Sequence, residues 1–172
     1  MKTKPQPIDE EIHVISGKVP MFKTDTDAIV EYANDYLLDL SEYKAGNLMG
    51  ESFLLLSHPD MPRTILDMAW KQIINKKPVS TIMKLISETG KFFWLQIRLD
   101  FKVDEQTNEV KNVYFYGHKA PITSTIELNK LYDKLSKIEK ESSLEYSEKY
   151  FNNYLENLGL DYNSFFEKYV KF

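Results

Sequence analysis

The sequence predicts an α+β domain in which helices cover one face of a five-stranded antiparallel sheet, followed by a helical C-terminal extension. Three observations lead to this prediction. Two short strand patterns are followed by helical segments and then by three further strand patterns. Residues 92–103 alternate apolar and polar side chains without a break, which is typical of a strand with one buried face. From Ile122 onward, apolar residues recur at helical spacing to the end of the chain.

The first elements are a polar lead-in and a short hairpin. Residues 1–18 are polar and contain prolines, so we expect a loosely ordered lead-in or an N-terminal cap on the domain. Residues 19–24 and 29–33 are strand candidates. The Asp-Thr-Asp sequence at 25–27 between them supplies side chains that stabilise a turn.

Helices follow the hairpin. Asn34 or Asp35 is a suitable cap for a short helix, and a second short helix or turn is expected over residues 44–48. A longer helix is predicted from about residue 60 to residue 76, because apolar residues recur there at three- and four-residue spacing. Asp60 lies where a capping side chain is expected for this helix.

Three strands complete the predicted domain. Residues 79–87 and 92–103 form a hairpin through a tight connection at 88–91, and residues 110–118 form the last strand. We therefore place the domain at residues 19–119 and the helical segment at residues 120–172.

The C-terminal segment is expected to act in output or association. Leu128, Leu131, Leu135 and Ile138 step by three, four and three residues, which is a seam of about two heptads. Together with a tail rich in Tyr and Phe, the seam favours a homodimer or receptor-docking surface through the helices after Ile122. The alternative is an amphipathic segment that packs back on the sheet of the same molecule.

Composition excludes several classes of function. The net charge is −4 and the lysines are interleaved with acidic residues, which argues against nucleic acid as the main partner. There is no cysteine, and no apolar run is long enough to insert into a membrane. No phosphate loop, nucleophile elbow or His-Glu-x-x-His motif is present. We therefore expect a cytoplasmic protein that is not an enzyme and holds no metal.

Short sequence words at the element junctions resemble those of PAS domains. Residues 32–36 read Tyr-Ala-Asn-Asp-Tyr, residues 41–43 read Ser-Glu-Tyr, and Gly50 follows. This order resembles the Y-A-N-x-x-F, S-G-Y and G phrase of the family. The resemblance implies the PAS fold, with its five-stranded antiparallel sheet covered by helices.

Two further words resemble the aerotaxis-receptor type of PAS domain in particular. Residues 58–62 read His-Pro-Asp-Met-Pro with Trp70 downstream, and residues 90–94 read Gly-Lys-Phe-Phe-Trp. In that group the PAS domain binds FAD and reports redox state to a chemotaxis signalling module. Some members consist of a PAS domain alone and work beside a separate membrane receptor, and this chain resembles that type.

The resemblance implies a flavin site, with departures. Asn34, His58, Asp60 and Trp70 match family residues at or near the flavin, whereas Ser57, Val79 and Leu85 replace the family's Arg, Trp and Asn. Losing such polar partners costs about 1 to 3 kcal/mol each when they are buried. FAD is therefore a candidate cofactor whose binding these three replacements weaken.

Each candidate site residue also has a structural interpretation. His58 could contact a flavin, ligate a haem iron, or only form the turn before the long helix. Trp70 could stack on a ring system or belong to the core. The strand face of Val79, Thr81, Met83 and Leu85 could line a ligand pocket or be filled by its own side chains.

Two hypotheses follow from this sequence. In the first, the chain is a signal-transduction sensor, with flavin as a candidate ligand, that couples redox or ligand state to a chemotaxis-type receptor. In the second, it is a ligand-free PAS adaptor that mediates dimerisation or receptor docking.

Overall fold

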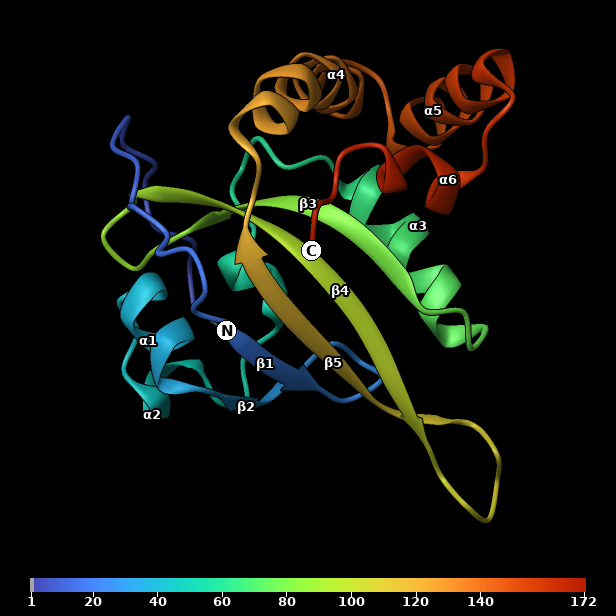
Figure 1. Ribbon diagram of the computed structural model, residues 1–172. Coiled ribbons are helices and arrows are strands. Elements are labelled where there is room, and N and C mark those ends of the chain that lie inside the picture. The colour runs from blue at the N-terminus through green and yellow to red at the C-terminus, as the bar shows by residue number, and fades with distance from the viewer. Residues whose placement is uncertain (1) are drawn as a thin grey trace.

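Five strands form one antiparallel sheet in the computed structural model, which describes residues 2–172 (Figure 1). The strand order is β2-β1-β5-β4-β3, so β1 and β5, the first and last strands along the chain, pair with each other inside the sheet. This confirms the predicted α+β fold with a five-stranded antiparallel sheet. The strands are β1 (Met21–Thr24), β2 (Val30–Ala33), β3 (Val79–Ile86), β4 (Phe92–Val103) and β5 (Val110–Lys119).

Helices cover the sheet in two groups. The first group connects β2 to β3, and α3 is its longest member (Figure 1). The second group follows β5, with α5 lying beside α3 and α6 lying along β3. The helices are α1 (Asp35–Ser41), α2 (Ala45–Leu48), the 3-10 helix η1 (Phe53–Leu56), α3 (Arg63–Ile74), α4 (Ile122–Glu141), α5 (Leu144–Leu158) and α6 (Tyr162–Glu167).

Strand β4 is buried on both faces over its first half. Phe93, Leu95 and Ile97 face the core beneath α3, as their alternation predicts. Trp94 and Gln96 on the opposite face are buried too, because the C-terminal segment covers them. Gln96 exchanges two hydrogen bonds with the main chain of Lys171, at 2.6 and 3.0 Å.

The long helix α3 begins at Arg63, three residues after the predicted start at about residue 60, and Asp60 does not cap it. Pro62 occupies the N-cap position and provides no side-chain hydrogen bond. The carboxylate of Glu139 in α4 accepts hydrogen bonds from the main-chain N–H groups of Arg63 and Thr64, at 2.9 and 3.2 Å. A distant residue therefore satisfies donors that a local cap usually satisfies.

The lead-in is docked on the sheet, so of the two alternatives that we predicted for it, a loose lead-in or an N-terminal cap, the structure has the docked one. Ile12 donates its main-chain N–H to Phe92 O at 2.8 Å, and Phe92 N donates to Glu10 O at 2.9 Å. Gly90 lets the chain pass close by, since a Cβ atom there would lie 2.1 Å from the carbonyl oxygen of Gln6. These bonds extend the β3–β4 hairpin by a short parallel ribbon.

The C-terminal helices fold back on the same molecule. Leu128, Leu131 and Leu135, three of the four seam residues, are buried inside the chain. Ser143 caps α5 and Gly159 ends it with φ +68°. Within residues 2–172, no helix combines the length and the apolarity that crossing a bilayer requires.

Candidate functional site

The space between α3 and the sheet is filled with side chains. Phe22 stacks on Phe115 with ring centroids 4.1 Å apart, and Phe53 packs against Phe115 at 5.4 Å. Trp70 extends this aromatic group outward by stacking on Phe53 at 6.2 Å. The residues that we expected around a ligand therefore lie in or beside a packed interior.

Asn34 uses its side chain to join three elements. Its Oδ1 accepts hydrogen bonds from Leu37 N and Met21 N, both at 3.0 Å, and its Nδ2 donates to Val19 O at 2.8 Å. The amide thus caps α1 and ties it to the first strand. These three bonds take up the amide oxygen and one of the two amide protons.

His58 is buried, with 4% of its surface exposed. Its Nδ1 accepts the main-chain N–H of Asp60 at 3.0 Å, and its ring meets the edge of Phe92. Burial, followed by the charge of Lys84, lowers the pKa of His58 from 6.5 to about 4. The imidazole is therefore neutral at physiological pH and carries its proton on Nε2.

Asp60 faces the surface rather than the interior. Its carboxylate lies 3.5 Å from the ammonium of Lys140 in α4 and 3.9 Å from that of Lys84 in β3. Its main-chain oxygen accepts a 2.7 Å hydrogen bond from Ser136 Oγ, also in α4. The loop at residues 58–62 is thus a docking surface for the first C-terminal helix.

The remaining expected residues belong to the packed core and its rim. Met83 and Leu85 are fully buried, and Val79 and Thr81 on the same strand face are buried with them. Trp70 is half-buried and lines two surface cavities on the outer side of α3. Five well-defined cavities in residues 2–172 are not lined by Asn34, His58, Asp60, Met83 or Leu85. In this packing Met83 and Leu85 are buried, and the polar atoms of Asn34, His58 and Asp60 contact the main chain or neighbouring side chains. The flavin site that the resemblance implies stays a prediction.

Two tyrosines of the C-terminal segment reach into the domain at the β3 edge. Tyr132 Oη donates to Ile82 O at 2.5 Å, which satisfies a carbonyl that the edge strand leaves unpaired. Tyr162 Oη lies 3.0 Å from Ile65 O and 2.9 Å from Thr81 Oγ1. Because a carbonyl only accepts, Tyr162 donates to Ile65 and accepts from Thr81. Burial raises the pKa of both phenols, so both stay protonated.

A second buried polar group joins α3, α4 and α5. The Glu139 carboxylate accepts from Thr64 Oγ1 at 3.0 Å and from Ser147 Oγ at 3.1 Å, in addition to its two main-chain donors. Thr64 and Ser147 also contact each other at 2.7 Å. Sequence reasoning missed these residues, because single Glu, Thr and Ser residues on amphipathic helices carry no pattern that separates a buried partner from a solvated one.

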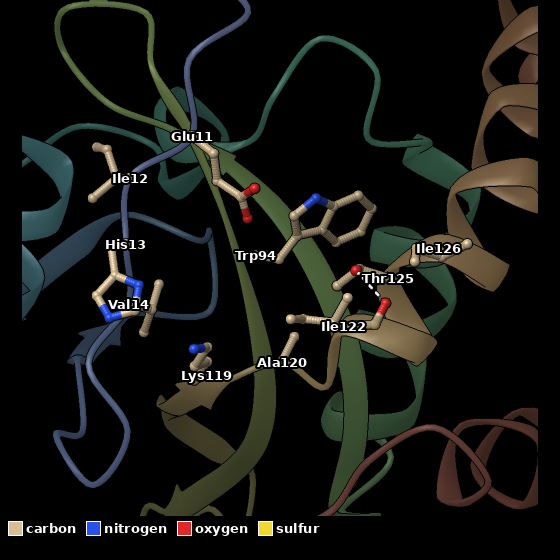
Figure 2. A pocket seen from close by; sticks show the side chains of 10 residues that line it. All are labelled: Glu11, Ile12, His13, Val14, Trp94, Lys119, Ala120, Ile122, Thr125 and Ile126. Carbon is tan, nitrogen blue, oxygen red and sulfur yellow. Dashed lines mark hydrogen bonds between the residues drawn. The ribbon is translucent and has the colours of Figure 1, made fainter.

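A cavity of about 420 Å³ lies at the junction between β5 and α4. Figure 2 shows the lead-in residues Glu11 to Val14 on one side of Trp94 and Ile122, Thr125 and Ile126 of α4 on the other. The cavity thus touches the lead-in, the sheet and the start of the output helix. Sequence reasoning did not predict this cavity, because no local pattern pairs the lead-in with the start of β4.

The described part of the chain offers no cluster of three or more metal-ligating side chains.

No family model matches the sequence. Over 96 residues, 56% of this chain, the sequence is 25% identical to the aerotaxis receptor of Escherichia coli (strain K12). This match spans 19% of the length of that receptor.

Solved structures show the same fold. A light-oxygen-voltage domain studied with a flavin analogue superposes with a TM-score of 0.57 at 17% identity, covering 64% of this chain and 84% of that chain. A PAS domain of a protein from Colwellia psychrerythraea superposes with a TM-score of 0.52 at 14% identity, covering 58% and 85%. The chain therefore has the PAS fold, and its sequence resembles that of the aerotaxis receptor.

Proposed function

We propose that this chain is a signal-transduction PAS protein that passes the state of its core to a chemotaxis-type receptor through α4–α6. The observation that carries the proposal is the direct connection between core and output. Helix α4 begins three residues after β5 ends, and it packs on the 58–62 loop and on the β3 edge. A change at the sheet or at that loop therefore changes the packing of α4.

The mechanism is a shift between two packings of the output helix. Ser136, Glu139 and Lys140 of α4 hold it to the core through polar contacts, and each of these contacts depends on the position of the 58–62 loop or of the start of α3. A ligand or partner that binds this region shifts the population toward the packing that it binds more tightly. The size of the shift depends on the difference between its affinities for the two packings. The receptor then binds one packing better than the other.

Flavin sensing is the second candidate, favoured by the likeness to the aerotaxis receptor. FAD inside the domain would have to displace the stacked rings of Phe22, Phe53 and Phe115. The packing thus favours signalling without an internal flavin. The visible absorption spectrum of the purified protein, before and after incubation with FAD and gel filtration, separates the two. A retained flavin band would make the chain a flavin sensor.

Site-specific photo-crosslinking in cells tests the relay. A photo-reactive residue at Ile126 or Tyr146, both exposed on the C-terminal helices, is expected to capture the cytoplasmic part of a chemotaxis receptor. The same residue at Thr107, in the exposed loop between β4 and β5, is the control. Capture of a receptor from Thr107 alone, or from none of the three positions, would contradict the proposal.

The expected homodimer would have to use a surface other than the leucine seam. Leu128, Leu131 and Leu135 are covered within the molecule, whereas Tyr146 and Tyr150 on α5 are exposed. Measuring the mass of the chain in solution, with and without Tyr146→Lys, tests whether α5 supplies the contact. A cytoplasmic location and the lack of enzymatic activity stay predictions.

A further inference from the structure

The walls of the junction cavity are held in place by the sheet. Glu11 pairs with Phe92 in a parallel bridge, two residues before Trp94. Because side chains alternate along a strand, Phe92 and Trp94 lie on the same face of the sheet, and the paired Glu11 lies with them. The hydrogen bonds of the flanking Glu10 and Ile12 to Phe92 fix this register. The cavity is therefore part of the fold rather than a gap beside a loose terminus.

Opposite charges and a free donor line this cavity. Within residues 2–172, no hydrogen bond or ion pair engages the carboxylate of Glu11, the ammonium of Lys119 or the indole N–H of Trp94. The neighbouring Glu10, in contrast, pairs with Lys91 at 3.7 Å. The lining of the cavity thus includes one anionic acceptor, Glu11, and one cationic donor, Lys119, with the indole of Trp94 beside Glu11 (Figure 2).

The helical wall is apolar and uncovered. Ile122 and Ile126 lie one turn apart on α4 and are 66% and 59% exposed. Both line the cavity together with Trp94. Large aliphatic side chains this exposed beside a cavity mark a place where an apolar group can be buried.

We propose that the junction cavity binds a free α-amino acid with an apolar or aromatic side chain. Its ammonium pairs with Glu11, its carboxylate pairs with Lys119, and its side chain packs on Ile122 and Ile126. Charge complementarity on both ends of the zwitterion is the reason for this choice of ligand. The volume of about 420 Å³ is within the usual range for small-molecule sites.

Such a ligand would connect the lead-in to the first turn of α4. In this step the inference rests on the proposed function, because the ligand then becomes a signal that the output helix reads. Binding favours the packing of α4 in which Ile122 and Ile126 close over the cavity. The binding itself depends only on the cavity and is measured without any receptor.

Isothermal titration calorimetry on the full chain with L-leucine and L-phenylalanine tests the proposal. Glu11→Gln and Lys119→Gln are each expected to weaken binding by about tenfold or more, since each removes one charge-assisted contact. Asp9→Asn and Lys111→Gln remove exposed charges outside the cavity and are the matched controls. Leucine analogues that lack either the amino group or the carboxylate should bind about as weakly as leucine binds the variants.

Three outcomes would overturn the proposal. The unaltered chain could bind neither amino acid, Glu11→Gln and Lys119→Gln could bind as tightly as the unaltered chain, or the analogue without an amino group could bind as tightly as leucine.

In a Trp70→Phe background, Trp94 is the one remaining tryptophan, and its fluorescence locates the bound ligand. Receptor capture from Ile126 can succeed when no amino acid binds, and it can fail when one does. The two proposals therefore fail separately.

Discussion

Replacing Glu139 by glutamine tests whether α4 supplies the cap of α3. The carboxylate accepts hydrogen bonds from the first two main-chain N–H groups of α3, and no side chain at the N-cap position competes with it. Glutamine keeps the size and one acceptor oxygen but removes the charge. It also places an amide donor where Thr64 and Ser147 now donate to the second oxygen.

The expected loss follows from two contributions. Removing a capping acceptor costs about 0.5 to 2 kcal/mol. Removing a negative charge from a helix N-terminus costs about 0.3 to 1 kcal/mol. Since glutamine retains one of the two oxygens, we expect Glu139→Gln to lower the free energy of unfolding by about 1 to 2 kcal/mol. For a chain of this length, that corresponds to a melting temperature lower by roughly 2 to 8 °C.

Urea denaturation measures the loss, and hydrogen exchange locates it. We expect a lower midpoint with an unchanged slope, and faster exchange of the amide protons of Arg63 and Thr64. Glu141→Gln is the control, because that side chain is exposed and makes no hydrogen bond or ion pair in the described chain. Equal midpoints for the two variants, or unchanged exchange at Arg63 and Thr64, would refute the capping argument.

Three further predictions concern other contacts. Tyr162→Phe should lower the free energy of unfolding by about 1 to 3 kcal/mol, because the buried Thr81 hydroxyl loses its partner and the Ile65 carbonyl loses a bond beyond its helical one. Since folding lowers the pKa of His58 from 6.5 to about 4, its neutral form stabilises the fold above pH 6.5, and about 3 kcal/mol is lost as the pH falls to 4. His58→Gln should remove this dependence, measured as denaturation midpoints across that range. Gly90→Ala should displace Gln6 and speed the exchange of the Ile12 amide proton.

Each of these predictions has a matched control. Tyr146→Phe changes an exposed phenol, and a midpoint shift as large as that of Tyr162→Phe would contradict the buried contacts. His13→Gln changes an exposed histidine, and the pH argument fails if this variant, rather than His58→Gln, flattens the profile. A Cβ at Gly46 meets nothing within 4 Å, so Gly46→Ala should leave the lead-in unchanged.

The sheet could be predicted from the sequence because its signals are local. Alternation over residues 92–103 identified β4, and a cap at Asn34 or Asp35 identified the start of α1, where the structure has Asn34. The start of α3 was misplaced for a physical reason. Asp60 has the right chemistry for a cap, but ion pairs with Lys84 and Lys140 hold it elsewhere, and a residue 76 positions away caps the helix.

The candidate site was less predictable, because two proteins can share short sequence motifs and a fold while different side chains fill their interiors. His58 and Asn34 occupy the junctions that the PAS resemblance assigned to them, yet their polar atoms bond to the main chain. The packing of the C-terminal segment could not be read from its seam. The same spacing of leucines suits a dimer and a fold-back, and the choice depends on what the opposite surface offers.

The energetics of the C-terminal segment limit what a signal can do to it. Seven Leu and Phe residues of α4–α6 are buried against the core, and they contribute about 10 to 20 kcal/mol. This is as large as the total stability of a typical domain, so detaching the whole segment would unfold the protein. The first turns of α4 differ, because Ile122 and Ile126 are exposed and one hydrogen bond, from Ser124 Oγ to Tyr169 O at 2.7 Å, attaches this part of the helix. A shift there costs little, so the part of the output helix that borders the junction cavity is the part that a signal can move.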